Sequence, residues 1–496
     1  MPEPAEKTSP SARKSAVRSG LLTGLGQLLQ AGAGAGAAVL LAHRFGRTAT
    51  TDGFLAAYGV YLVLGLAAQS FRLVVVPVLT RAAAAGRLAG ETRAWAIAFG
   101  LLSVPVCLIA IAARHPIGVA LTNNPTSARE ASTAIAFLVP AAFVQLLAAL
   151  LASSLAALDE YTVAALAWGI GSPIGLVVFA ALSHSHGLIT LAWGVLIGGC
   201  TTTAILLVEL TRRSSLLGGP SVPLRAPGRM FELTRGAAVP LAVQGMYVVS
   251  LRLAGGLGVG ATSSLSYAYV FAATLVSATA SAFSLISSAP LTRRGIDAAG
   301  AARHVVHAAW LSLVGVAAAT GVFALVGGRL VGGALGSAYT GSVGSQLGRL
   351  VVYFAPWMVV TVAFTVVFPL LFVVEKPSVL LPLAPVALLV HVPVSLALRA
   401  WLHLDGLGLG LAVSTTFVLA VLLAAVSPRL LGLALAGLAR VAASLGALAV
   451  AAFGLSALVL SGLPAAAVGL AAYGAVLAVV RPRGLREALV YVRALH

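Results

Sequence analysis

The stretch "SFRLVVVPVLTR" at residues 70–81 is a long apolar run that ends with a helix-breaking proline, a hydroxyl and a cation. A second stretch, "AFSLISSAPLTR" at residues 282–293, repeats its phenylalanine, two leucines, threonine and final arginine. The constant offset of about 212 residues is typical of an internal duplication. We therefore predict two related halves, in which each stretch ends the same helix.

The composition indicates a polytopic membrane protein. Of the 496 residues, 60% are hydrophobic and only 9% are charged, whereas a soluble domain has roughly 25% charged residues. The formal net charge of +18 could suggest nucleic acid, but the basic residues lie in short clusters between apolar runs, as in the cytoplasmic loops of membrane proteins. We therefore expect membrane lipids, and no nucleic acid, as partners.

Apolar runs long enough to cross a bilayer as helices occur about 14 times. We predict an all-α fold with two lobes of about six helices each and two further C-terminal helices. The predicted spans are 20–42, 53–79, 94–113, 131–156, 162–182, 187–208, 236–258, 265–289, 304–326, 347–372, 378–398, 406–426, 433–459 and 462–480.

The pattern of charges and linkers predicts the domain organisation. Most of the 31 Lys and Arg residues fall on one side if the N-terminus is inside, which places both termini in the cytoplasm and the chain in the cytoplasmic (inner) membrane. The predicted parts are a disordered cytoplasmic tail (1–19), an N-terminal lobe (20–211), a cytoplasmic linker (212–235), a C-terminal lobe (236–426), and two extra helices with a basic cytoplasmic tail (427–496).

Arg252, in "VQGMYVVSLRLAGGLG" at residues 243–258, is the strongest candidate for function. An arginine in hydrocarbon costs roughly 3 kcal/mol or more unless it faces a partner or a cavity. The neighbouring Gln244, Tyr247 and Ser250 are also polar, which favours a wet interior that binds substrate. A structural ion pair is the alternative.

Arg72 and Asp52 are less specific candidates. Arg72 lies about five residues before Pro77, where it can either extend to the lipid headgroups or contact a phosphate. Asp52 precedes an apolar helix, a position where a carboxylate caps the helix start, and a transport role is the alternative. No carboxylate lies at the centre of a predicted span, which weakens an ion-coupled mechanism.

The remaining chemical groups predict no catalytic or metal centre. Cys107 and Cys200 each lie inside an apolar run, so they indicate packing and no disulfide framework. The histidines of "SHSH" at 183–186, and those at 304 and 307, lack further ligands at metal-binding spacing. His391 and Arg399, about two helical turns apart, can share one helix face. Since no hydrolase or nucleotide-binding motif occurs, we expect neither an enzyme nor a cofactor.

The segment "FGRTATTDGFLAAYGVYLVLGLAAQSFRLVVVPVLTRAAAAG" at residues 45–86 resembles the opening of the MurJ/MviN lipid II flippases. That family has a "Thr-Asp-x-Phe" entry and a "Phe…Val-Pro-x-Leu" exit. The segment "SLSYAYVFAATLVSATASAFSLISSAPLTR" at residues 264–293 is similar to the family's helix eight. The matching residues of the first segment are Thr51, Asp52, Phe54, Phe71, Val76, Pro77 and Leu79.

This resemblance implies the fold of the multidrug/oligosaccharidyl-lipid/polysaccharide (MOP) exporters. Two lobes would surround a central cavity that opens alternately to either side, and the two extra helices would form a groove for a lipid tail. Asp52 and Arg252 would be cavity residues. The arginines of the family's first two helices are replaced here by small or apolar residues, among them Ala31, Ala37, Val63 and Leu64.

The predicted function is a flippase for a polyprenyl-pyrophosphate-linked glycan, either lipid II or another envelope precursor. One alternative is an ion-coupled drug or metabolite exporter of the same superfamily. Another is a non-transporting scaffold that partners cell-wall synthesis proteins. The predicted substrate-binding residues are Arg252, Asp52, Arg72, Gln244 and Tyr247.

Overall fold

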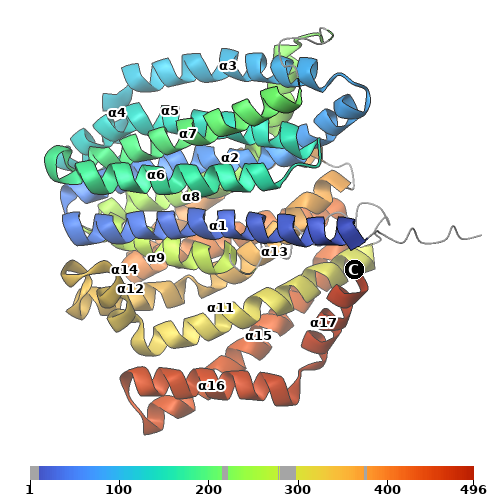
Figure 1. Cartoon of the computed structure of the whole chain (residues 1–496). Helices are drawn as coiled ribbons and strands as arrows, with labels where there is room; N and C mark the ends of the chain where they lie inside the picture. Colours follow the sequence, from blue (N-terminus) through green and yellow to red (C-terminus); the bar gives the residue numbers. More distant parts are fainter. Residues whose placement is uncertain are drawn as a thin grey trace, which may run out of the picture. The chain divides into compact units, whose positions relative to one another are not determined.

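The computed structural model describes residues 10–214, 220, 222–277, 279, 298–373 and 377–495. Within these residues the chain is helical and has no strand, since helices satisfy their own backbone groups in a bilayer. Figure 1 labels most of the helices. The helices are α1 (Pro10–Phe45), α2 (Ala49–Ala84), α3 (Leu88–Ala112), α4 (Arg114–Leu121), α5 (Pro125–Ala156), α6 (Thr162–His186), α7 (Ile189–Arg213), α8 (Ala226–Gly255), α9 (Ala261–Val276), α11 (Ala298–Leu335), α12 (Gly341–Tyr353), α13 (Ala355–Val373), α14 (Leu380–Val426), α15 (Pro428–Val459), α16 (Gly462–Val480) and α17 (Arg483–Leu495), with 3-10 turns η2 (Ser337–Tyr339) and η3 (Pro377–Val379).

The prediction of an all-α, multi-pass membrane protein is confirmed. Among the described residues, nine helices are long and apolar enough to cross a bilayer, or ten if the bent pair α12 and α13 counts as one span. Each predicted span overlaps a helix, although the second half of the span 265–289 lies outside the described residues. The repeated stretch 282–293 lies outside them too.

Three predicted boundaries differ from the structure. The tail is helical from Pro10 onward, because proline is well tolerated in the first turn and Ala, Arg and Lys favour helix. The linker was predicted to extend to residue 235, but α8 already begins at Ala226. The predicted span 347–372 is two helices that meet at 41° near Phe354, where Pro356 cannot continue the backbone ladder of α12.

The chain forms two compact units. Unit 1 comprises residues up to Leu41, Ala57–Ala120 and Ala128–Pro240. Unit 2 comprises Ala42–Ala56, Leu121–Ser127 and the chain from Leu241 onward. The first turns of α2 therefore belong to unit 2, whereas the rest of that helix belongs to unit 1.

In unit 1, α6 and α7 pack side by side through glycines (Figure 1). A Cβ atom at Gly175 would lie 2.5 Å from the carbonyl oxygen of Gly194, and one at Gly171 would lie 2.5 Å from that of Gly198. Both pairs are spaced by four residues, so they line one face of each helix. Small residues at this spacing let membrane helices approach closely, which provides van der Waals contact in place of a hydrophobic driving force.

Unit 1 also holds a buried ion pair at the start of α8. Arg229 is paired with Glu91 of α3, and the two side chains are only 11% and 12% exposed. The Arg229 guanidinium lies 5.1 Å from the ring centroid of Trp95 and donates a 2.9 Å hydrogen bond to the carbonyl of Leu224. Arg229 therefore fixes the entry of α8 against α3.

In unit 2, the long helix α14 is bent at His403, whose backbone is non-helical (φ 52°, ψ −125°). The two halves fold back on each other. A Cβ atom at Gly406 would lie 2.2 Å from the carbonyl oxygen of Leu398, and one at Gly410 would lie 2.5 Å from Ser395 Oγ. The predicted spans 378–398 and 406–426 are thus joined by a turn centred on one residue.

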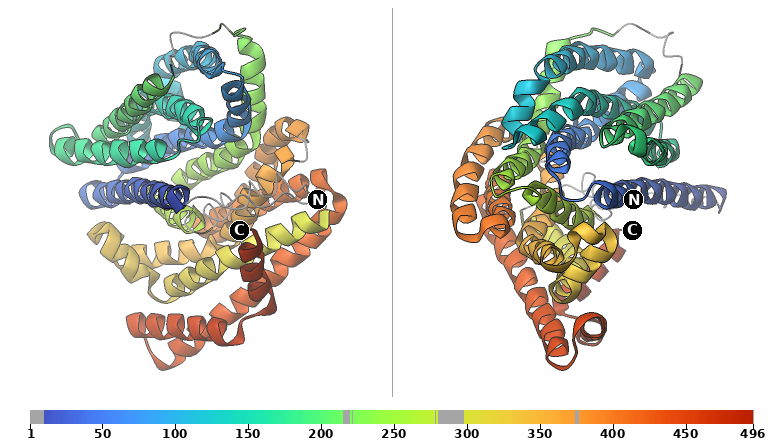
Figure 2. Two further views of the ribbon diagram at one scale, coloured as in Figure 1. Left: turned by 45° about the vertical axis from the view of Figure 1, so that its right-hand side comes forward. Right: turned by 90° about the vertical axis from the view of Figure 1, so that its left-hand side faces the viewer.

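The two helices after α14 pack onto α11 (Figure 2). The ring of Phe453 in α15 occupies the space that side chains at Gly321 of α11 and Gly469 of α16 would need. The opposite faces of α15 and α16 are apolar and open, with Leu458 and Val479 more than 80% exposed. These faces fit the hydrocarbon of a bilayer.

Candidate functional site

Asp52 lies in the first turn of α2 and binds the start of α9. Its Oδ2 atom accepts a 2.6 Å hydrogen bond from the backbone N–H of Gly260. Its Oδ1 atom accepts bonds from the N–H (2.8 Å) and the hydroxyl (2.5 Å) of Ser263. The side chain is buried. A carboxylate at a helix N-terminus is stabilised both by the free N–H groups and by the helix dipole.

The prediction that Asp52 caps the start of its own helix is wrong, because Asp52 instead caps the start of α9. The start of α2 is capped by Thr48, whose Oγ1 accepts a hydrogen bond from the N–H of Thr51 at 3.2 Å. Gly260, the residue before α9, has a left-handed backbone (φ 85°) that suits glycine. Gly260, as the N-cap residue of α9, makes no side-chain capping hydrogen bond. Asp52, from a distant part of the sequence, supplies the cap instead.

Arg47 and Tyr339 hold the same corner of unit 2. Arg47 Nε donates a 3.3 Å hydrogen bond to the carbonyl of Gly260. The Tyr339 hydroxyl donates to the carbonyl of Gly46 at 3.3 Å. Burial raises the pKa of the Tyr339 phenol, so it stays protonated at neutral pH. The loop before α2 is thereby fixed to η2 and to the turn before α9.

Gln244 and Tyr247 lie together on the face of α8 that packs on α9. The Tyr269 hydroxyl donates to Gln244 Oε1 at 2.8 Å, and the Tyr247 hydroxyl donates to Ser266 Oγ at 3.0 Å. The two tyrosine rings are stacked with centroids 3.9 Å apart. Both predicted site residues are buried, so within unit 2 they join two helices.

The same face of α8 continues to a histidine that the sequence did not single out for chemistry. Ser250 Oγ lies 3.1 Å from His391 Nε2, and Ser414 Oγ lies 3.0 Å from His391 Nδ1. Ser395 Oγ lies 3.2 Å from His391 Nε2. His391 is fully buried. The pairing with Ser395, four residues away on the same helix, was the available sequence signal.

Arg252 lies a little more than one turn beyond Tyr247 on the same helix. It follows Tyr247 by five residues, which places it about 140° further round the helix. The side chain is half-buried, and the backbone carbonyl accepts a 2.8 Å hydrogen bond from Asn123 Nδ2. Arg72 lies within α2, but its side chain is outside the described residues. The substrate-binding roles of both arginines stay predictions.

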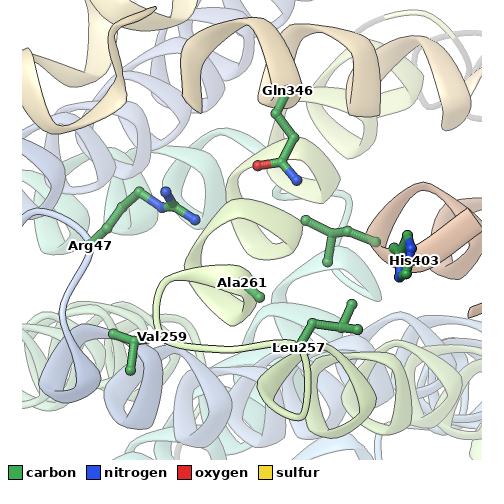
Figure 3. A pocket seen from close by; sticks show the side chains of 7 residues that line it. Arg47, Leu257, Val259, Ala261, Gln346 and His403 are labelled. Carbon is green, nitrogen blue, oxygen red and sulfur yellow. The ribbon is translucent and has the colours of Figure 1, made fainter. Parts of the chain in front are cut away.

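A cavity of about 280 Å³ opens in unit 2 beside the Asp52 cap (Figure 3). Arg47, Gln346 and His403 direct polar groups toward it from three separate segments of the chain. His403 is the residue at the bend of α14, and its positive φ costs a side-chain-bearing residue about 1–3 kcal/mol. The apolar walls of the cavity are formed by Leu257, Val259, Ala261 and Leu404.

Comparison with solved structures shows the fold. The chain is similar to the lipid II flippase MurJ in an inward closed conformation, with a TM-score of 0.73 and 14% identity over 94% of this chain and 99% of that one. It is similar to an inward-facing multidrug resistance MATE transporter of the MOP superfamily (TM-score 0.62, 13% identity, 85% and 95%). A MOP superfamily transporter from Pyrococcus furiosus also matches (TM-score 0.54, 14% identity, 88% and 99%).

These likenesses confirm the resemblance to the MurJ-type MOP proteins at the level of the fold. No protein-family model and no curated protein matches the chain.

Proposed function

We propose that this protein is a flippase of the MOP type that moves a polyprenyl-pyrophosphate-linked glycan, lipid II or a related envelope precursor, across the cytoplasmic membrane. The observation that carries the proposal is the likeness to MurJ over 94% of this chain and 99% of the MurJ chain. The MATE transporter matches 85% of this chain. A flippase would lie in the inner membrane with both termini in the cytoplasm, and it would perform no covalent chemistry.

The C-terminal helices support a lipid-linked substrate. α15 and α16 follow the predicted duplicated lobes and present open apolar faces, as described above. A polyprenyl tail can remain in contact with such a surface while the polar head crosses, because the tail then never leaves an apolar environment. A carrier of small soluble drugs has no need for this surface.

The cationic residue proposed to meet the pyrophosphate is Arg252. Arginine binds phosphate oxygens through two parallel N–H donors, and it keeps its charge in a poorly solvated site. Arg252 lies on α8 five residues after Tyr247, and its side chain is half-buried. Arg72 is the second proposed phosphate contact.

The test is rescue of a bacterial strain depleted of its lipid II flippase, with membrane insertion measured in the same cells. Rescue by the wild-type chain and its loss in Arg252→Ala would support the proposal. Arg114→Ala is the matched control, since Arg114 is exposed and belongs to α4, outside the helices proposed to bind the substrate. Transport by a well-inserted Arg252→Ala variant would remove Arg252 from the site.

An ion-coupled exporter is the second candidate, supported by the likeness to MATE transporters. It predicts uptake of a cationic drug into inverted vesicles that depends on a sodium or proton gradient. Asp52 was the predicted coupling carboxylate, but both of its oxygens accept hydrogen bonds from the start of α9. If the chain neither rescues growth nor moves drug or labelled glycolipid, a scaffold that binds cell-wall synthesis proteins becomes the better proposal.

A further inference from the structure

We propose that the cavity lined by Arg47, Gln346 and His403 binds a phosphoryl group. This phosphoryl pocket lies wholly within unit 2 and contains none of the residues predicted to bind the transported substrate. The inference therefore stands independently of the proposed flippase function. Its volume of about 280 Å³ accommodates a phosphate with part of an attached group.

The Arg47 side chain is held by one hydrogen bond, from its Nε atom, which leaves its two terminal amino groups available as donors within the described part of the chain. Its Nε donates to the carbonyl of Gly260, which fixes the direction of the guanidinium. Within the described part of the chain, the two terminal amino groups have no hydrogen-bond acceptor, and they point into the pocket (Figure 3). The nearby carboxylate of Asp52 interacts with Arg47 electrostatically, but its oxygens are occupied by Gly260 and Ser263.

Two further donors reach the pocket from other elements. The Gln346 amide extends from α12, and the His403 imidazole extends from the bend of α14 (Figure 3). Neither side chain has a hydrogen bond to another described residue. The imidazole also lies near Asp405, whose carboxylate is bound to Arg349 at 3.0 Å. Arg349 therefore offsets part of the negative charge of Asp405.

The arrangement of donors favours a tetrahedral anion. A guanidinium, an amide and an imidazole approach from three sides, which matches a group that presents oxygens in three directions. A planar carboxylate offers only two oxygens, and the guanidinium alone would satisfy both. The positive φ of His403 makes the turn of α14, and the imidazole at this turn reaches the pocket.

The pocket is placed where a phosphate can come from either of two sources. Trp401, two residues before His403, is 84% exposed, and exposed tryptophans are enriched at the membrane–water interface. On the predicted orientation this is the outer surface. A phosphate at this level belongs either to a lipid headgroup or to a dissolved molecule.

The experiment measures binding of radiolabelled inorganic phosphate to the purified full-length protein in detergent, with sulfate and acetate as competitors. We expect sulfate to compete and acetate not to. Arg47→Gln should weaken binding by about tenfold or more, because it removes a charge-assisted bidentate contact. Arg114→Gln is the matched control, since Arg114 is exposed and lies in unit 1.

The variant His403→Gly distinguishes a role of His403 in phosphate binding from a role in the stability of the fold. Glycine suits the positive φ at this position, so the variant should melt at a higher temperature than the wild type. It should nevertheless bind phosphate more weakly, because the imidazole is gone. A structural role alone would move stability and binding in the same direction.

A second arm uses nanodiscs of phosphatidylcholine with or without phosphatidic acid, and it measures retained lipid by mass spectrometry. Phosphatidic acid that is retained by the wild type and lost in Arg47→Gln, without binding of inorganic phosphate, would identify a lipid headgroup as the ligand. Binding of inorganic phosphate would identify a dissolved ligand. The proposal is overturned if neither probe binds, or if Arg47→Gln and Arg114→Gln bind alike.

Discussion

Asp52 and Ser263 are 211 residues apart in the sequence, yet both the backbone N–H and the hydroxyl of Ser263 donate to one oxygen of the Asp52 carboxylate. The second oxygen accepts from Gly260. The separation is close to the offset of the two repeated stretches, which is about 212 residues. The start of a helix in the first predicted half thus caps the start of the corresponding helix in the second half.

Replacing Asp52 by alanine should destabilise the protein by about 1–3 kcal/mol, since buried N–H groups lose their acceptor. Asp52→Asn should cost less, because the amide oxygen still accepts one set of bonds. Thermal unfolding in detergent measures the effect. The control is Asp159→Asn at an exposed turn, which should leave the melting temperature unchanged. Equal melting temperatures for Asp52→Ala and wild type would contradict the capping role.

Removing the His391 imidazole should cost about 2–5 kcal/mol, because it leaves a cavity and removes the hydrogen-bond partner of three serines. We expect His391→Ala to lower the melting temperature far more than His184→Ala, since His184 is exposed. Hydrogen exchange in α8 and α14 should rise in the first variant alone. Unchanged exchange would mean that the serines do not depend on the histidine.

A methyl group at the crossing of α6 and α7 should separate the helices. Gly175→Ala places a Cβ atom 2.5 Å from the Gly194 carbonyl, and overpacking of this kind costs about 1–3 kcal/mol. The same substitution at Gly100 of α3 meets no atom within 4 Å. Gly100→Ala should therefore stabilise the protein by about 0.5–1 kcal/mol, because alanine loses less backbone conformational entropy than glycine on folding. Two shifts of the same sign in thermal unfolding would refute this account of the interface.

The Glu91 and Arg229 pair should behave as a coupled unit. Glu91→Gln leaves the Arg229 charge poorly solvated and should cost about 3 kcal/mol. Arg229→Met in the same background should recover part of that loss, which a double-mutant cycle measures. By comparison, Glu209→Gln breaks a pair whose arginine is 42% exposed and should cost less than about 1 kcal/mol. Additive losses at Glu91 and Arg229 would show that the pair is not coupled.

The sequence predicted the helices well because each span is a property of one contiguous run. It missed the break at Phe354, although Pro356 was the local signal for it. It placed the boundary between the spans 378–398 and 406–426 correctly, but could not show that His403 alone makes the turn.

The predicted site was harder to obtain, because a sequence does not say which helices face each other. Gln244 and Tyr247 were noted as polar neighbours of Arg252 that favour a wet interior, and the structure gives both of them hydrogen-bond partners on α9. Their partners Ser266 and Tyr269 lie on α9, in a segment noticed only for its resemblance to a family. The pocket at Arg47 could not be predicted either, since its polar residues come from three distant segments.

The turn at His403 joins the two halves of α14 by a connection that has no extra residues. Leu398 and Gly406 already touch across it, as do Ser395 and Gly410, so no spare residue can absorb a change in chain length. A tag, protease site or single inserted residue at 402–404 would shift every later contact of the hairpin out of register. Reporter fusions intended to map the topology of this protein should therefore avoid this end of the hairpin.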